Sequence, residues 1–168
     1  YDNRKLDNKY YDLMKINKSY CQKYNYDYLF INKDYDIPPW WVKVYLIKKY
    51  LLSDKYSGIL WLDTDACVFN NKIELDDESI FKNDKFFFIT GDRKGWGKSV
   101  FNSGVFFILN NEIMCNLMED WYSNYDKTLW YKDKNNKFTT DEKWAVSNAY
   151  EQGSFCNNIL NKYKEYIN

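Results

Sequence analysis

The sequence predicts an α/β domain in which a mostly parallel sheet is flanked by helices. Segments with helical spacing alternate with short apolar runs, the pattern expected when helices connect parallel strands. The chain has 168 residues, enough for a buried core, and we expect a single domain over residues 1–168. Hydrophobic residues make up 45% and aromatic residues 21%, which argues against a disordered chain.

The first half of the chain contains two helix patterns and two β-rich runs. Residues 6–23 place apolar side chains on one face at helical spacing. Residues 26–32 form a short β-rich run, and the consecutive prolines in 33–39 predict a loop after it. Residues 40–52 have the length of a helix. Residues 59–69 have a continuous apolar character that predicts a central strand covered on both faces.

The second half continues the alternation. The patterns predict a short helix near 77–82, a strand at 85–90, a glycine-bearing loop at 91–99, a strand at 103–109, a helix at 111–125, a polar connection at 126–137, and helices at 139–152 and 156–167. The helix at 139–152 is expected because it opens with a threonine N-cap followed by acidic residues. Since the chain starts with a helix and ends without a final strand, we expect a fold trimmed at both ends.

Composition excludes several classes of function. The 24 basic and 24 acidic residues give zero net charge, so no global field attracts nucleic acid or an anionic membrane. No apolar run approaches the ~20 residues of a membrane span, so we expect none in this chain. Histidine is absent, which removes Ser-His-Asp and Cys-His nucleophiles and histidine metal sites. The four cysteines form no CxxC pair and are expected to be free core thiols, a usage typical of the cytoplasm.

Two carboxylates stand one residue apart at the end of the predicted central strand. In "LWLDTDACVFN", Asp63 and Asp65 follow a hydrophobic run and precede another. Residues i and i+2 of a strand project to the same side, so the two carboxylates would repel each other unless a cation lies between them. Hard oxygen ligands suit Mg²⁺ or Mn²⁺, which keep open positions for phosphates. The alternative is an ordinary acidic turn at a strand end.

The neighbouring segments carry a resemblance. "LWLDTDACVFN" resembles the DxD segment of GT-A nucleotide-sugar transferases, and in particular the retaining family 34 of xyloglucan xylosyltransferases and fungal α-galactosyl- and α-mannosyltransferases. "NKSYCQKYNYDYLF", "WWVKVYLIKKYL", "FNSGVFFILNN" and "TTDEKWAVSNAY" resemble further segments of that family in the same order, over roughly residues 8–150. The chain departs from the family at Tyr24-Asn25, Leu109 and Glu142, where His-Gly, Arg and Gln are usual.

The resemblance implies a Rossmann-like GT-A fold and a site for a UDP- or GDP-sugar, with a glycan as acceptor. Asp63 and Asp65 would hold Mn²⁺ or Mg²⁺ on the donor diphosphate, although the first carboxylate of such pairs often contacts ribose or acts through water. A backbone and amide group at Asn102, Ser103 and Gly104 would lie beside the donor sugar. The alternative for these three residues is an Asn-Ser-Gly turn.

The remaining candidates come partly from the residues themselves. The resemblance implies that Asp141 binds sugar hydroxyls. It places Glu142 near the anomeric carbon, as electrostatic support or as a nucleophile. The alternative for both residues is the acidic charge that is common at a helix N-terminus. Lys43 lies on a mainly apolar helix and could reach a phosphate, or be a surface lysine with a buried stem. Arg93 and Trp96 lie in the glycine-bearing loop and could close over donor or acceptor, or stay solvated.

Two other functions compete with a metal-dependent, retaining glycosyltransferase. One is a degenerate GT-A domain that binds a nucleotide or glycan without turnover, because the family's third metal ligand, a histidine, has no counterpart here. The other is a HAD-type phosphatase, whose strand also ends in DxD. The position two residues past the second aspartate is Cys67, where that class has Thr or Val.

Overall fold

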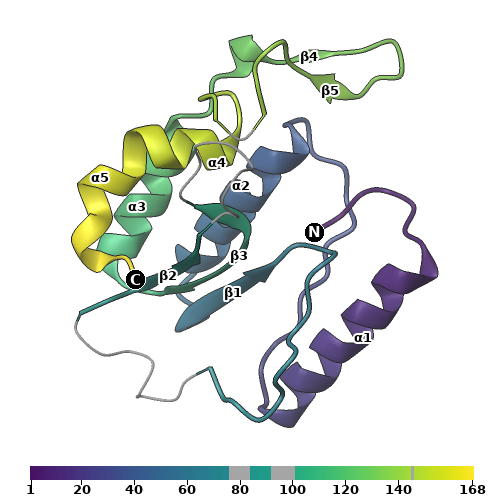
Figure 1. The fold of residues 1–168 in the computed structure, drawn as a ribbon, viewed down its shortest axis with the longest axis vertical. Helices are drawn as coiled ribbons and strands as arrows, with labels where there is room; N and C mark the ends of the chain where they lie inside the picture. The colour runs from purple at the N-terminus through teal and green to yellow at the C-terminus, as the bar shows by residue number, and fades with distance from the viewer. Residues whose placement is uncertain (76–83, 92–100, 145) are drawn as a thin grey trace.

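The computed structural model describes residues 1–75, 84–91, 101–144 and 146–168. Its main elements are α1 (Asn8–Lys23), α2 (Pro39–Leu51), β1 (Gly58–Leu62), β2 (Phe87–Thr90), β3 (Asn102–Leu109), α3 (Glu112–Ser123), β4 (Tyr131–Lys132), β5 (Phe138–Thr139), α4 (Glu151–Ser154) and α5 (Leu160–Tyr163). Short turns of helix, Lys127–Leu129, Phe155–Ile159 and Lys164–Tyr166, complete the secondary structure of the described ranges. In Figure 1, α2, α3 and the C-terminal helices gather on one side, and α1 stands apart from them across β1.

The central sheet has three strands in the order β1-β3-β2. β3 pairs antiparallel with both neighbours, so β1 and β2 run in the same direction on either side of it. The expected mostly parallel sheet is therefore wrong for the strands that the structure describes. Among the described residues, Phe87 of β2 and Ile167 form an isolated parallel bridge, in which Asn168 N donates to Phe87 O at 2.9 Å.

The core lies between the sheet and the helices α2 and α3. β3 alternates, with Phe106 and Ile108 fully buried against the helices and Phe107 on the opposite face. Trp41 of α2 and Trp121 of α3 are also fully buried, and both indole nitrogens donate to carbonyls near the start of α4. The hydrogen bonds satisfy the polar atoms of these large side chains inside the core.

The first three helices confirm their sequence patterns. Pro39 opens α2 at the position where a missing N–H costs nothing. Asn111 caps α3, since its side chain accepts from Met114 N at 2.8 Å. The C-terminal helix expected at 156–167 is present as a helical run of mixed geometry from Glu151 to Tyr166. The helix expected near 77–82 and most of the loop expected at 91–99 lie outside the described residues.

Two expected elements are different in the structure. Residues 26–32 form no strand and pair with no strand of the described chain. The helix expected at 139–152 is not formed over most of that range, because Phe138 and Thr139 pair with β4 in a hairpin. Residues 140–144 and 146–150 are turns and irregular chain. Asn136 at the hairpin turn has a φ of 60°, a conformation that asparagine tolerates well.

Candidate active site

The carboxylate pair lies where β1 ends. Asp63 N donates to Gly104 O at 2.8 Å, which continues the β1–β3 ladder by one residue. Ala66 N then donates to Asp63 O at 2.9 Å, so Asp63, Thr64 and Asp65 form a turn rather than the end of a strand. Asp63 is half-buried, and Asp65 is exposed. The structure thus holds the first carboxylate against the sheet and leaves the second open to solvent.

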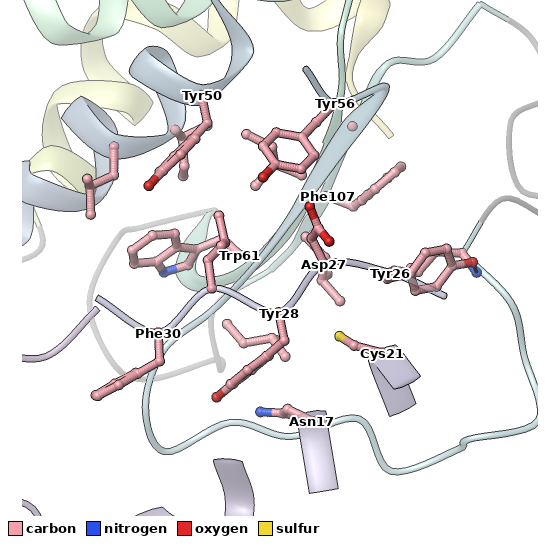
Figure 2. A pocket seen from close by; sticks show the side chains of 18 of the residues that line it. Asn17, Cys21, Tyr26, Asp27, Tyr28, Phe30, Tyr50, Tyr56, Trp61 and Phe107 are labelled. Carbon is pink, nitrogen blue, oxygen red and sulfur yellow. Dashed lines mark hydrogen bonds between the residues drawn. The ribbon is translucent and has the colours of Figure 1, made fainter. Parts of the chain in front are cut away.

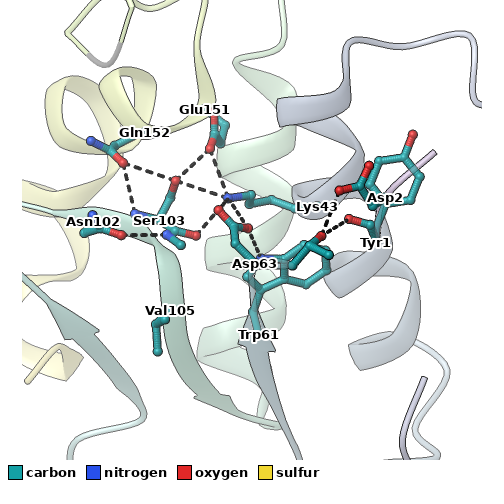
Figure 3. Close-up of polar contacts among 12 residues, drawn as sticks. Tyr1, Asp2, Lys43, Trp61, Asp63, Asn102, Ser103, Val105, Glu151 and Gln152 are labelled. Atoms are coloured by element: carbon teal, nitrogen blue, oxygen red, sulfur yellow. Dashed lines mark hydrogen bonds and ion pairs between the residues drawn. The ribbon is translucent and has the colours of Figure 1, made fainter. Parts of the chain in front are cut away.

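Lys43 of α2 lies at the centre of the polar contacts around Asp63 (Figure 3). Its Nζ is 3.0 Å from Asp63 Oδ1 and donates to Ser103 O at 2.9 Å. It is also 3.4 Å from Glu151 Oε1. Only 7% of the lysine side chain is exposed, so the ammonium lies inside the protein. Protein oxygens accept its hydrogen bonds. The alternative of a surface lysine with a buried stem is therefore wrong, and a contact with a phosphate stays a prediction.

Glu151 and Gln152, at the start of α4, complete the cluster. Ser103 Oγ donates to Glu151 Oε1 at 2.7 Å, and Ser103 N donates to Gln152 Oε1 at 3.0 Å. Glu151 is 2% exposed, and its Oε2 has no hydrogen-bond partner among the described residues. Sequence analysis missed both residues, because they lie 48 and 49 positions from Ser103 and no local pattern marks them.

The absence of a side chain at Gly104 leaves room for the Asp63 carboxylate. A Cβ at residue 104 would come within 2.9 Å of Asn102 Oδ1 and 3.2 Å of Asp63 Oδ2. Asn102 Oδ1 in turn accepts from Gly104 N at 2.9 Å. The Asn-Ser-Gly segment therefore starts β3 directly beside Asp63, and the structure brings Asn102, Ser103 and Gly104 together with Lys43 and Asp63.

Two further contacts fix the turn that carries the carboxylates. Trp61 Nε1 donates to Asp63 Oδ1 at 2.8 Å. Thr64 Oγ1 donates to Asp2 Oδ2 at 2.9 Å, and Asp2 also pairs with Arg4. Burial raises the pKa of Asp2, but hydrogen bonds from the side chain and backbone of Arg4 and from Thr64 outweigh it and lower the pKa to about 2. Asp2 therefore stays ionised at neutral pH.

The loop after the carboxylate pair is held by α1. Asn17 is buried, and its Nδ2 donates to Ala66 O at 3.0 Å. Its Oδ1 accepts from Val68 N at 2.9 Å. One amide side chain thus satisfies two backbone groups of residues 66–68 and fixes the chain that leaves Asp65.

A cavity of about 500 Å³ adjoins this turn (Figure 2). It lies between residues 25–31, α1 and β1, and both Asp63 and Thr64 reach it. Aromatic and apolar side chains line most of it, among them Tyr20 and Tyr28. Burial and then the neighbouring Tyr26 raise the pKa of Tyr20 to about 12, so its hydroxyl stays a hydrogen-bond donor. No sequence pattern predicted this cavity.

The other predicted residues lie elsewhere or outside the described ranges. Asp141 and Glu142 are exposed on the turn after β5, and the described contacts of their side chains do not include the Lys43 cluster. Tyr131 Oη donates to Asp141 Oδ1 at 2.8 Å. Arg93 and Trp96 lie outside the described residues. The four cysteines are free, as expected, but each is half-buried rather than in the core.

The described carboxylates do not by themselves complete a metal site. Within the described ranges no three Asp, Glu, Cys or His side chains converge on one point. Mg²⁺ and Mn²⁺ accept one or two carboxylates and complete their coordination with phosphates and water. Asp65 is the exposed carboxylate of the pair and could accept such an ion together with a bound diphosphate, whereas both oxygens of Asp63 lie within 3.4 Å of Lys43 Nζ.

The fold is one that a glycosyltransferase adopts. The chain matches the crystal structure of a glycosyltransferase involved in the glycosylation of the major capsid of PBCV-1, with a TM-score of 0.68 and 15% identity. The match covers 99% of this chain and 76% of that one, so the likeness extends over the whole fold described above. No family model and no curated protein matches the sequence. No helix within the described part of the chain is long and apolar enough to cross a membrane.

Proposed function

We propose that this protein is a metal-dependent glycosyltransferase that moves a sugar from a UDP- or GDP-sugar to a hydroxyl of a glycan, with retention of configuration. The observation that carries the proposal is the carboxylate pair at the end of β1, with Asp63 held by the buried Lys43, in a fold shared with a glycosyltransferase. Retention and the link to family 34 rest on the sequence segments that resemble that family.

Each polar residue of the site then has a role. Asp65, together with Asp63 directly or through water, would hold Mn²⁺ or Mg²⁺. When bound, the metal neutralises the charge that develops on the leaving diphosphate. Lys43 is a positioning residue that fixes Asp63, since its ammonium is engaged by Asp63, Ser103 and Glu151. Asn102 and the backbone of Gly104 lie next to Asp63, where a donor sugar would lie.

The cavity and the turn after β5 supply the remaining parts. The aromatic cavity reaches Asp63 and Thr64 and has room for the planar base of the donor. Asp141 and Glu142 are exposed, so their carboxylates are open to a bound sugar. On the family resemblance alone we assign Asp141 to the sugar hydroxyls and Glu142 to electrostatic support of the anomeric carbon during front-face substitution, since the described contacts do not bring either carboxylate to the Asp63 site.

One experiment tests the proposal. The protein is incubated with Mn²⁺ and a panel of UDP- and GDP-sugars, and nucleotide release is followed. We expect release that Asp65→Ala abolishes and that Asp12→Ala, an exposed aspartate on α1, leaves unchanged. Thermal stabilisation by UDP and Mn²⁺ without release would instead identify a binding domain. Phosphate release from a phosphomonoester would contradict both.

A further inference from the structure

Arg4 lies beside the turn that carries the two carboxylates. Its Nη2 is 2.6 Å from Asp2 Oδ2, the same oxygen that accepts from Thr64 Oγ1 at 2.9 Å (Figure 3). Thr64 is the residue between Asp63 and Asp65. Because both bonds end on one carboxylate oxygen, the guanidinium lies next to the hydroxyl at the centre of the turn. The segment before α1 thus brings a cation to the carboxylate pair.

Asp2 binds one edge of the guanidinium and leaves other donors of the group free. Arg4 Nε and the backbone N of Arg4 both donate to Asp2 Oδ1 at 2.9 Å, and Nη2 donates to Oδ2. No described residue accepts from Nη1. The side chain of Arg4 is 70% exposed, whereas that of Asp2 is 5% exposed. The buried carboxylate therefore fixes the arginine, and the Nη1 donors remain available to a ligand.

The use of arginine at residue 4 matters, because the chain uses lysine for nearly every other cation. Arg4 and Arg93 are the two arginines among the 24 basic residues. A lysine could neutralise Asp2, but it presents a single nitrogen. A planar guanidinium can bind Asp2 with one edge and a phosphate with the nitrogen that remains. Arginine is therefore the residue suited to joining this buried carboxylate to a second anion.

The charges around the turn leave Arg4 available to a bound anion. Lys43 is buried, and protein oxygens already surround its ammonium. Asp65 is exposed, so a diphosphate bound at this turn is repelled unless cations balance the carboxylate. Hydrogen bonds to Asp2 raise the pKa of Arg4, and the charges of Asp2 and Asp65 add to the shift. The guanidinium therefore stays charged within electrostatic range of Asp65.

We propose that Arg4 is a donor-binding residue whose Nη1 donates to the diphosphate of the nucleotide sugar bound at the turn of Asp63 and Asp65. The inference rests on the proposed function for the identity of the ligand, but binding of a diphosphate does not require sugar transfer. Asp2 and Thr64 are positioning residues, because they hold the arginine at the turn.

The first test measures binding without transfer. UDP, GDP and inorganic pyrophosphate are titrated by calorimetry in the presence of Mn²⁺. We expect Arg4→Gln to weaken the tightest of these ligands about tenfold or more, the value of a hydrogen bond between charged groups. Lys15→Gln, which removes the exposed cation paired with Asp12 on α1, is the matched control and should change the affinity less than about twofold. Equal affinities of Arg4→Gln and Lys15→Gln would overturn the inference.

A second pair of variants separates contact with the ligand from support of the turn. Arg4→Gln leaves the buried Asp2 without its cation, which by itself can disturb the turn. In an Asp2→Asn background that uncompensated charge is gone. We expect Arg4→Gln in this background to leave the melting temperature unchanged and still to weaken diphosphate binding about fivefold. An unchanged affinity there would show that Arg4 only neutralises Asp2, and would overturn the inference.

The outcomes also separate the inference from the proposed function. Nucleotide release with a donor KM that Arg4→Gln leaves unchanged would remove the role of Arg4 and keep the transferase. Diphosphate binding that depends on Arg4, without nucleotide release from any nucleotide sugar, would keep the role of Arg4 and remove the transferase.

Discussion

The ammonium of Lys43 and the carboxylate of Asp63 form a 3.0 Å ion pair in which the cation is buried and the anion is 40% exposed. The pair joins α2 to the end of β1, two elements that carry the site. Because Glu151 lies on the other side of the lysine at 3.4 Å, one cation balances two carboxylates.

Lys43→Met should destabilise the protein by about 3–5 kcal/mol, the usual cost of removing one partner of a buried ion pair. The loss leaves Glu151 buried without its cation and next to Asp63. Urea unfolding followed by circular dichroism measures it. Adding Glu151→Gln should restore part of the stability. Lys15→Met, which removes an exposed pair with Asp12, should cost less than about 1 kcal/mol; similar losses for Lys15→Met and Lys43→Met would contradict this account.

Gly104→Ala should impair the site more than the fold. Its Cβ would approach Asp63 Oδ2 at 3.2 Å and Asn102 Oδ1 at 2.9 Å, so the carboxylate must move. We expect nucleotide release to fall by about tenfold or more, as displacement of a positioned group does, with a small change in melting temperature. Gly58→Ala, whose Cβ meets the Phe107 ring on the same sheet, is the comparison. Equal effects of the two variants on release would argue against a special role for Gly104.

Asn17→Asp should loosen the loop that follows Asp65. The carboxylate can still accept from Val68 N, but it no longer donates to Ala66 O and instead repels that carbonyl. We expect a loss of about 1–3 kcal/mol in the free energy of unfolding, the cost of leaving a buried backbone group unpaired. Hydrogen exchange of the amides of 66–68 localises the effect. Asn3→Asp, at an exposed hydrogen bond, serves as the control; unchanged exchange would show that α1 does not hold the loop.

Acid should release the contact between Asp2 and the Thr64 turn. The pKa of Asp2 in the folded protein is about 2, below its ordinary value of 3.8, so folding is favoured by the ionised form. The stabilisation is complete well above pH 4 and is lost as the pH falls through about 2. Melting temperatures are measured from pH 7 to pH 2 for the wild type and for Asp2→Asn. The wild type should melt at the higher temperature at neutral pH, and the two curves should converge at the acid end. Parallel curves would show that Asp2 is not the titrating group.

Local patterns predicted the parts of the fold that local forces determine. The helical spacing of 6–23 and 40–52 gave α1 and α2 within two residues, and the apolar run before Asp63 gave β1. Strand direction was wrong, because it depends on which segments meet over long separations in sequence. Apolar runs in parallel and antiparallel central strands look alike.

Local patterns also marked some residues of the candidate site and missed others. Asp63, Lys43 and Ser103, which the structure brings together, were each selected from a local pattern at a strand end or on an apolar helix, and their roles stay predictions. Glu151 was not, because its role depends on contacts with residues far along the chain. A helix was predicted at 139–152 because acidic residues after a threonine resemble a helix start. The strand pair of Thr139 with Tyr131, closed by a turn at Asn136, forms there instead.

The outer edge of β1 has a consequence for how copies of this protein behave together. Among the strands that the structure describes, β1 pairs only with β3, and its other edge borders the cavity. An unpaired edge beside apolar side chains is a template for another extended chain, so β1 is where self-association would begin in concentrated solution. A ligand that fills the cavity would cover that edge, and light scattering should then show less aggregation with ligand than without it.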